Sequence, residues 1–253
     1  MSVQWIQPEW PVPNNVHALI TTREGGLSRG AYGVPPDSAS GMNIGLGCGD
    51  DVTHVTANRA LLRASLPADP CWLHQVHGAA VVDAARAEPG AIADASFTDE
   101  ANVVCVVSIA DCMPVLLADA SGRSVGVAHA GWRGLAAGVI QATARAIRAR
   151  LKDPGAELLA YLGPAIGPRH FEVGAEVVAA MQAGLPDAGR AFTERPNGKY
   201  LGNLFALGRQ ALDQAGVARI YGCNDCTFSD PRRFYSFRRD GVTGRHAALI
   251  WRI

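Results

Sequence analysis

The sequence lacks the features that mark several large classes of protein. Lys+Arg and Asp+Glu both total 23, so the formal net charge is zero and offers no overall attraction to nucleic acid or anionic membrane. The first residues show no basic segment followed by an apolar run, so no secretory signal is expected. The longest nearly uncharged apolar stretch, 101–118, is interrupted by Asp111 and Pro114 and is too short to span a bilayer. We therefore expect neither a nucleic-acid-binding protein nor a membrane protein.

Cysteine is scarce, and its spacing does not suit a disulfide framework. Six cysteines are spread unevenly over 253 residues, whereas disulfide-rich domains are short chains with dense cysteines. We expect a reducing cytoplasm, with thiols that are free or bound to metal. The closely paired ligands of a zinc finger are also missing, because the one C-x-x-C pair, Cys223 and Cys226, has no second pair.

Strand and helix patterns alternate along the whole chain. The apolar, β-branched run 103–109 is typical of a buried strand. Apolar residues recur every three to five positions over 135–151, which predicts one long amphipathic helix. Further strands are predicted at 16–22, 72–73, 81–82, 114–118, 124–128 and 158–162, and near Ile220, Tyr235 and 248–251. Further helices are predicted from an Asp50 or Asp51 cap to near Pro67, and over 174–183 and 201–215.

No repeat, low-complexity tract or long linker divides these elements, although residues 25–49 read as a glycine-rich loop. Mixed strands and helices over the full length predict an α/β (mixed α+β) fold. We expect one domain over residues 1–253, built on a mixed central sheet layered with helices.

Two histidines and a cysteine at the ends of predicted strands form the main candidate site. They are His77 of HQVHG, Cys112 of IADCMP and His129 of VAHAGWRG. Zinc prefers imidazole nitrogen and thiolate sulfur, and catalytic zinc sites keep three protein ligands and one open position. The residues alone leave a simpler interpretation open, because a histidine beside a turn is often a surface residue and a cysteine in an apolar strand is often core.

Two residues beside Cys112 bear on this site. Successive strand side chains point to opposite faces, so Asp111 and Cys112 cannot both face one ion in a regular strand. Either the chain turns here, or Asp111 has another role, such as orienting a metal-binding histidine or capping a turn. Met113 should likewise point away from Cys112.

The segment HAGWRG runs from a predicted strand into a helix. Gly131 and Gly134 allow close approach of the backbone, and Arg133 together with free N–H groups at the helix start suits a phosphate. A plain tight turn is the alternative. Cys226 is predicted to lie near the site and Cys223 to be incidental. One or two arginines of a basic stretch are candidates for an anion pocket, the alternative being a solvated face: Arg232, Arg233, Arg238, Arg239 and Arg245.

A series of motifs in one order covers nearly the whole chain. They are TTREGGLSRGAYG, MNIG, HQVHG, ADASFTD, ADCMPVLLAD, VAHAGWRGLAAGV, GPAIGPRHFEVG and CT…FYSFRRDGVTGR. In these motifs the chain resembles the laccase-domain family, also called the YfiH or multicopper polyphenol oxidase family. Many members of that family are regarded as zinc-dependent purine nucleoside phosphorylases.

The resemblance implies a YfiH-like fold and places the metal ligands on His77, Cys112 and His129. It places a loop arginine and asparagine near the substrate, on Arg23 and Asn43, and gives His74 no ligand role. The implied substrates are a purine nucleoside of the adenosine or inosine type and phosphate, and the implied cofactor is Zn²⁺, with Cu²⁺ as the alternative. Where relatives often carry a cysteine, this chain has Arg169 and His170, a departure that affects substrate preference. The expected form is a monomer or a weak homodimer.

Several mechanisms are compatible with these residues. Phosphorolysis is the main expectation, and a water in the fourth metal position would suit deamination of adenosine as a second reaction. A copper-dependent polyphenol oxidase needs more histidines than the 7 present. A hydrolase or deamidase would use Cys112 as nucleophile and His129 as base. A purely structural zinc site would need a fourth protein ligand.

Overall fold

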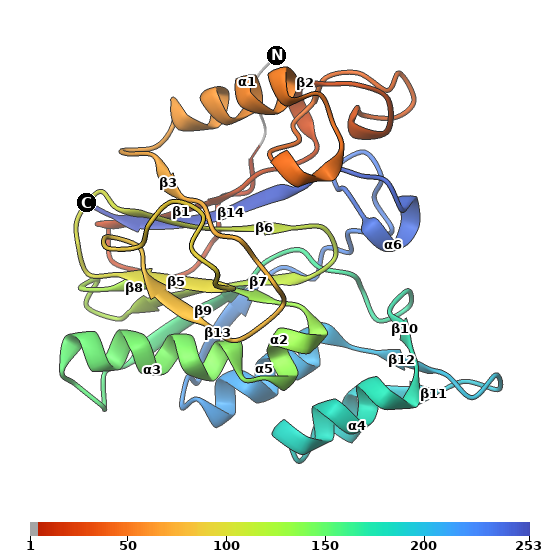
Figure 1. Cartoon of the computed structure of the whole chain (residues 1–253). Coiled ribbons are helices and arrows are strands. Elements are labelled where there is room, and N and C mark those ends of the chain that lie inside the picture. Colours follow the sequence, from red (N-terminus) through yellow and green to blue (C-terminus); the bar gives the residue numbers. More distant parts are fainter. Residues whose placement is uncertain (1–4) are drawn as a thin grey trace.

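The computed structural model describes residues 5–253, and its strands form two stacked sheets with helices on both outer sides (Figure 1). Helix α1 (Val52–Arg63) covers one side. The other side is covered by α2 (Trp132–Ala136), α3 (Val139–Leu151) and α5 (Leu204–Gln214). Within this part of the chain, no helix is long and apolar enough to cross a membrane.

The sheet next to α1 has four strands in the order β1 (Val16–Ile20), β14 (His246–Arg252), β6 (Val104–Ile109) and β3 (Pro70–Cys71). β14 is antiparallel to both of its neighbours, whereas β3 runs parallel to β6. Segments from the two ends of the sequence therefore lie side by side in one sheet.

The sheet next to α3 has six strands, and it carries the strand ends at which the candidate site lies. Their order is β13 (Arg219–Gly222), β9 (Leu158–Leu162), β7 (Met113–Asp119), β8 (Val125–Ala130), β5 (Ala95–Thr98) and β4 (Val81–Asp83). Its central pairs are antiparallel, and its two edge pairs are parallel. Beyond α4 (Ala175–Gly184), three short strands form a separate sheet: β10 (Glu172–Val173), β12 (Tyr200–Gly202) and β11 (Phe192–Glu194). β2 (Glu24–Ser28) and α6 (Phe237–Asp240) complete the elements that matter below.

Strand β6 shows why the central strands are apolar on both sides. Cys105, Val107 and Ile109 pack between the two sheets, whereas Val104 and Val106 pack against the layer of α1. Because strand side chains alternate, a strand covered on both faces is apolar at most of its positions. The run at 103–109 is such a strand.

The predicted fold class is confirmed, since the molecule is a mixed α+β structure with mixed sheets and helices. Asp51 caps α1 as predicted, because its side chain accepts a hydrogen bond from the backbone N–H of Thr53 at 2.8 Å. The central strands are divided between two sheets, which the sequence pattern did not distinguish.

Several element predictions were wrong. The single helix over 135–151 is two helices, because Gly138 adopts φ 81°, a left-handed conformation that ends α2. Tyr235 is buried in an irregular segment just before α6 and not in a strand, and the strand expected at 72–73 lies instead at 70–71. The loop expected over 25–49 begins within strand β2.

Candidate metal centre

The chain turns sharply between β6 and β7, and this turn sets the direction of Cys112. Asp111 has φ 86°, so the strand does not run on through Cys112, and β7 begins at Met113. Met113 is buried in the core beside Gly208 of α5, as its predicted direction requires. It therefore does not offer its sulfur to the metal group as an axial ligand.

His129 lies near the end of β8, buried among the central strands. Its Nδ1 is 2.8 Å from Oδ1 of Asp94. An ionised carboxylate only accepts hydrogen bonds, so Nδ1 carries the hydrogen and Nε2 is left for a metal ion. This tautomer is the one that a ligating histidine needs.

His77 lies in the loop between β3 and β4 and has an exposed ring and φ 61°. The same carboxylate, Asp94, holds this loop: Oδ1 accepts from the N–H of His77 at 2.9 Å, and Oδ2 accepts from Val76 at 3.1 Å and Gly78 at 2.7 Å. Burial acts to raise the pKa of Asp94, but the hydrogen bonds from His129 and the loop outweigh it and lower the pKa. One buried carboxylate thus positions two of the three candidate ligands.

The three ligand atoms of His77, Cys112 and His129 all lie within 4.8 Å of one another. Atoms bound to a tetrahedral zinc at about 2.0–2.3 Å stand roughly 3.4–3.8 Å apart, so small side-chain rotations bring the three onto one ion. The donor set of two imidazoles and one thiolate fits zinc, and also copper. The group does not include His74.

Charges within the trio favour the deprotonated thiol. Burial acts to raise the pKa of Cys112, but the charge of His129 and hydrogen bonds from both histidines outweigh burial and lower the pKa to about 6. For His129, burial acts to lower the pKa, but the charge of Cys112 and the bond to Asp94 raise it to about 9. The sulfur is therefore poised as a thiolate, the form that binds metal.

Gly131 and Gly134 are needed for close packing around the trio. A Cβ atom on Gly131 would lie 2.6 Å from Sγ of Cys112, and one on Gly134 would lie 3.0 Å from the carbonyl oxygen of Gly78. The atoms that approach these two glycines closely therefore belong to Cys112 and Gly78 of the protein itself and not to a ligand. Helix α2 has only five residues, so its N-terminus alone makes a weak anion site, and Arg133 in its first turn lines the cavity.

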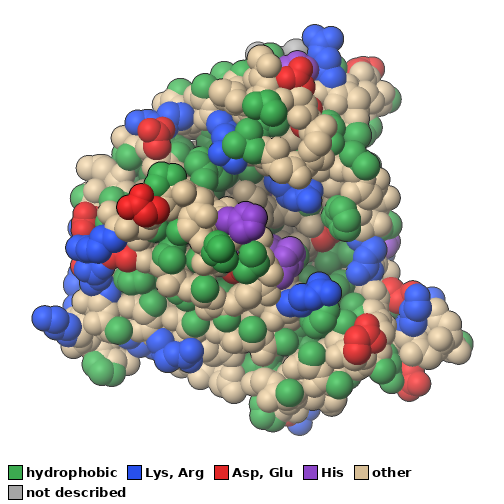
Figure 2. Space-filling model, in the orientation of Figure 1, with side chains coloured by type: hydrophobic (Ala, Val, Ile, Leu, Met, Phe, Trp, Pro, Cys, Tyr) green, Lys and Arg blue, Asp and Glu red, His purple; other side chains and the backbone are tan. Residues whose placement is uncertain are grey.

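A cavity of about 970 Å³ opens above the trio, and its wall includes residues from the N-terminal third, the middle and the C-terminal part of the chain. Figure 2 shows it as a hollow in the middle of the face, with histidine side chains inside it and basic side chains around it. Its size suits a ligand larger than a single phosphate.

The cavity wall is strongly basic. It carries four arginines, Arg59, Arg133, Arg238 and Arg245, and within residues 5–253 none of them forms an ion pair. The one carboxylate in the wall is Asp111, which accepts from Thr227 Oγ1 at 2.6 Å and from the N–H of Arg238 at 2.7 Å. Asp111 thus fixes the turn and the adjacent loop and does not orient a histidine. An excess of unpaired arginines marks this cavity as a site for anions.

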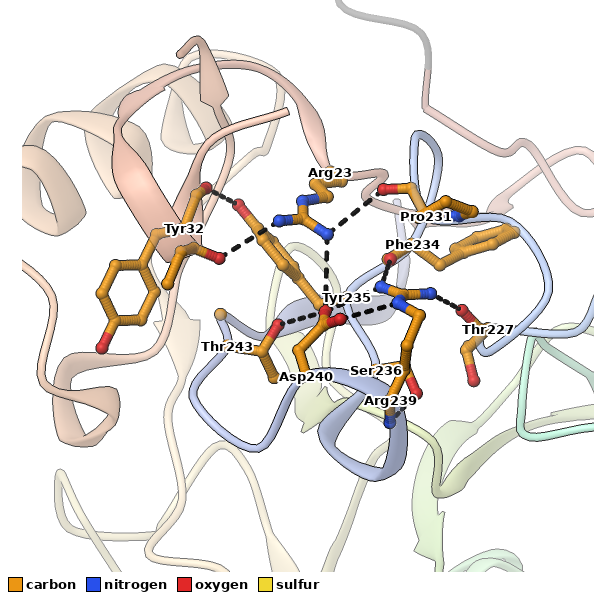
Figure 3. Close-up of polar contacts among 12 residues, drawn as sticks. Arg23, Tyr32, Thr227, Pro231, Phe234, Tyr235, Ser236, Arg239, Asp240 and Thr243 are labelled. Atoms are coloured by element: carbon orange, nitrogen blue, oxygen red, sulfur yellow. Dashed lines mark hydrogen bonds and ion pairs between the residues drawn. The ribbon is translucent and has the colours of Figure 1, made fainter. Parts of the chain in front are cut away.

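Arg23 lies behind the cavity wall, in the network shown in Figure 3. Its guanidinium donates to the carbonyl oxygens of Gly33, Ala31 and Pro231 and pairs with Asp240 at 3.5 Å. Arg23 therefore connects the N-terminal loop to the 231–240 segment, and its proximity to substrate stays a prediction.

Asn43 is also buried and outside the wall, but it holds two residues that line the cavity. Its Oδ1 accepts from the N–H of Gly45 at 2.9 Å and from that of Arg245 at 2.8 Å. The role inferred for Asn43 is thus indirect.

The two C-x-x-C cysteines do not line the cavity. Sγ of Cys226 accepts from the N–H of Gly167 at 3.1 Å, one residue from Ile166 in the wall, whereas Cys223 lies beside Leu162. The ring of His170 stacks on Phe228 at 4.2 Å between centroids, away from the trio. Asp94, Arg59 and Trp72 were not singled out from the sequence. Asp94 lies in the motif ADASFTD, which contributes to the family resemblance, but no role was assigned to it from the sequence.

Comparison with known proteins gives consistent results. The family model described as "Multi-copper polyphenol oxidoreductase laccase" matches residues 17–253. The chain is 46% identical over 250 residues to a purine nucleoside phosphorylase of Pseudomonas aeruginosa, with 98% of each chain covered. It is 44% identical over 252 residues to purine nucleoside phosphorylase YfiH of Escherichia coli, with 98% of each covered.

Two solved structures have the same fold. The Neisseria meningitidis protein NMB0706 superposes with a TM-score of 0.89 at 45% identity, covering 98% of each chain. YlmD of Geobacillus stearothermophilus superposes with a TM-score of 0.88 at 32% identity, covering 98% of this chain and 96% of its own. The resemblance seen in the sequence motifs is confirmed by these matches.

Proposed function

The chain belongs to the multi-copper polyphenol oxidoreductase laccase family, and from this premise we propose that it is a zinc-dependent purine nucleoside phosphorylase. The observation that carries the proposal is the meeting of His77, Cys112 and His129 beneath a cavity with four unpaired arginines. Relatives that match over nearly their full length are named purine nucleoside phosphorylase. The substrates are then a purine nucleoside and inorganic phosphate.

His77, Cys112 and His129 would hold the zinc ion, which when bound supplies a Lewis acid that polarises an oxygen of a reacting partner. Asp94 keeps the two imidazoles in position and fixes the tautomer of His129. In the reaction, a phosphate oxygen forms a bond to C1′ of the ribose while the bond from C1′ to the purine nitrogen breaks. The products are ribose 1-phosphate and the free base.

The cavity wall supplies binding groups for both substrates. The exposed ring of Phe237 offers an apolar face on which a purine can stack, whereas the indole of Trp72 is covered on one face by the guanidinium of Arg59 at 3.8 Å. Arg133 stands next to Gly131 and the trio, has an exposed side chain and stacks on Trp132 at 4.3 Å, and it stays the predicted phosphate contact there.

The direct test is to incubate purified, zinc-loaded protein with adenosine or inosine and phosphate, and to measure free base and ribose 1-phosphate. Cys112→Ala is expected to lose bound metal and at least 100-fold of the turnover while keeping the wild-type circular dichroism spectrum. Cys223→Ala removes another half-buried thiol, outside the cavity, and should keep both metal and turnover. A Cys112→Ala protein that lacks metal yet turns over at the wild-type rate would refute the mechanism.

The same preparation distinguishes the other reactions. Release of ammonia from adenosine would identify deamination, and oxygen uptake with a phenolic substrate on zinc-loaded protein would favour an oxidase. A Cys–His hydrolase is the candidate that the trio itself supports, because Cys112 and His129 lie together. Such an enzyme would stay active after removal of metal with a chelator, whereas phosphorolysis should stop.

A further inference from the structure

Two of the cavity arginines are anchored to the same short segment of the wall, residues 43–48. Nε of Arg59 donates to the carbonyl oxygen of Ile44 at 2.8 Å. The N–H of Arg245 donates to Oδ1 of Asn43 at 2.8 Å, and its carbonyl oxygen accepts from the N–H of Ile44 at 3.2 Å. Both guanidinium groups also act electrostatically on Cys48 at the end of this segment. The two arginines therefore form a pair on one wall of the cavity.

The pair is held in place but not neutralised. The guanidinium of Arg59 lies over the ring of Trp72 at 3.8 Å, and Nη1 of Arg245 donates to the carbonyl oxygens of Thr243 and Gly244. Within residues 5–253, Nη1 and Nη2 of Arg59 and Nε and Nη2 of Arg245 have no hydrogen-bond partner, and neither side chain meets a carboxylate.

When the aliphatic part of an arginine side chain is held in place and two guanidinium nitrogens are free, the planar guanidinium can bind a tetrahedral oxyanion through two hydrogen bonds at once. Two such groups on one wall provide charge for a dianion. The neighbouring Gly47 is exposed, and nothing lies within 4 Å of the place that its Cβ would occupy, so the backbone leaves room for the anion.

We infer that Arg59 and Arg245 form a phosphoryl-anion subsite on the 43–48 wall, separate from Arg133 on α2. The group that binds there is either inorganic phosphate or the 5′-phosphate of a nucleotide, since both present the same dianionic oxygens. If the occupant is inorganic phosphate, the inference rests on the proposed function and assigns its second substrate to this wall in place of Arg133. If it is a 5′-phosphate, the cavity accepts nucleotides as well as nucleosides.

The test is direct binding to the zinc-loaded protein, measured by isothermal titration calorimetry with two probes, inorganic phosphate and adenosine 5′-monophosphate. Arg245→Gln and Arg59→Gln each remove charge-assisted hydrogen bonds, so each should raise the Kd of the bound probe by about 10- to 100-fold. Arg59 also contacts Ile44 and Trp72, so Arg59→Lys is measured together with Arg59→Gln. The lysine keeps the positive charge but lacks the planar guanidinium that can form two parallel hydrogen bonds. Arg209→Gln is the matched control, because Arg209 is exposed on α5 and does not line the cavity.

The two probes separate the sources of the anion. Weaker binding of inorganic phosphate assigns the pair to the second substrate, and weaker binding of the nucleotide alone assigns it to a 5′-phosphate. Wild-type Kd values for both probes in folded Arg245→Gln and Arg59→Lys proteins, or no binding of either probe to the wild type, would overturn the inference. Because the experiment measures binding and not turnover, its result tests the subsite independently of the proposed phosphorolysis.

Discussion

At the scale of single residues, Asp94 accounts for the positions of two metal-binding side chains. Its two carboxylate oxygens accept four hydrogen bonds, one from the imidazole of His129 and three from the backbone of residues 76–78. Such a residue is hard to find from the sequence, because it lies 17 positions from His77 and 35 from His129. The metal ligands can be recognised in the sequence because they are histidine and cysteine residues at strand ends. The residue that holds the two histidines, Asp94, can be recognised only once the fold brings it next to them.

The Asp94→Asn variant should bind zinc about 10- to 100-fold more weakly. An amide replaces one accepting oxygen by an NH₂ group, so either the His129 side or the Val76–Gly78 side loses its acceptor. Competition with a zinc-binding dye measures the change. The Asp119→Asn variant is the control, since Asp119 is equally buried but pairs with Arg123 outside the cavity. Wild-type zinc affinity in Asp94→Asn would contradict the assigned role.

Gly131 provides a steric test of the trio. Its φ of −72° suits alanine, so a Gly131→Ala variant suffers little backbone strain, but the new Cβ would lie 2.6 Å from Sγ of Cys112. We expect displacement of the sulfur and at least a 10-fold loss of zinc affinity, measured with the same dye. In the comparison variant Gly138→Ala the Cβ would make only ordinary contact with Gln141 at 3.6 Å, but φ is 81°, so the variant should lose about 1 kcal/mol of stability and no zinc affinity. Equal zinc affinities in the two variants would count against the packing argument.

At the scale of elements, β14 joins the 231–240 segment to the sheet through His246. Nε2 of this fully buried histidine accepts from the backbone N–H of Tyr235 at 2.7 Å. Burial lowers the pKa of His246 to about 3, and the nearby charge of Arg23 acts in the same direction. The histidine is therefore neutral in the folded protein throughout the range in which an unfolded histidine gains a proton.

This depressed pKa makes stability depend on pH with a definite sign. The unfolded state binds a proton near pH 6.5 and the folded state does not, so the contribution is fully present above pH 6.5 and is lost as pH falls toward 3. Between pH 7.5 and 5.5, His246 should account for about 1.4 kcal/mol of lost stability. Urea unfolding of wild type and His246→Gln at both pH values measures it. The variant should lose about 1.4 kcal/mol less than the wild type, and equal losses would show that His246 titrates normally when folded.

The elements also show how far sequence patterns reach. The largely apolar runs 103–109 and 158–162 were predicted within one residue, because a strand buried on both faces carries few polar side chains, and Ser108 alone interrupts the first run. The periodicity over 135–151 continues across the α2–α3 boundary, so only the conformation of Gly138 reveals the break. The buried irregular segment at Tyr235 has the pattern of a strand because its aromatic residues make tertiary contacts with Arg23 and His246.

At the scale of the whole molecule, the proposed zinc ion would connect three distant parts of the chain. Its ligands lie in the loop after β3, in the turn between the two sheets, and on β8. An ion that binds only the folded state adds about 2.7 kcal/mol when its free concentration is 100 times its Kd. For a chain of this length that corresponds to a rise in Tm of roughly 5–11 °C.

Differential scanning fluorimetry with and without free zinc measures this rise. The Cys112→Ala variant serves as its control, since without the sulfur the rise should disappear. The prediction fails if the wild type and Cys112→Ala gain the same Tm, because the zinc would then be bound elsewhere.

The cavity wall and the metal group differ in how they are built. Two of the three proposed ligands stand on or directly beside core strands, whereas much of the wall comes from connecting segments such as 45–48 and 72–75. Core strands tolerate few replacements, while connecting segments accept insertions and exchanges readily. Proteins that share an ancestor can therefore come to bind different compounds while they keep the same three metal-binding residues. Selection for a new compound would act first on those connecting segments.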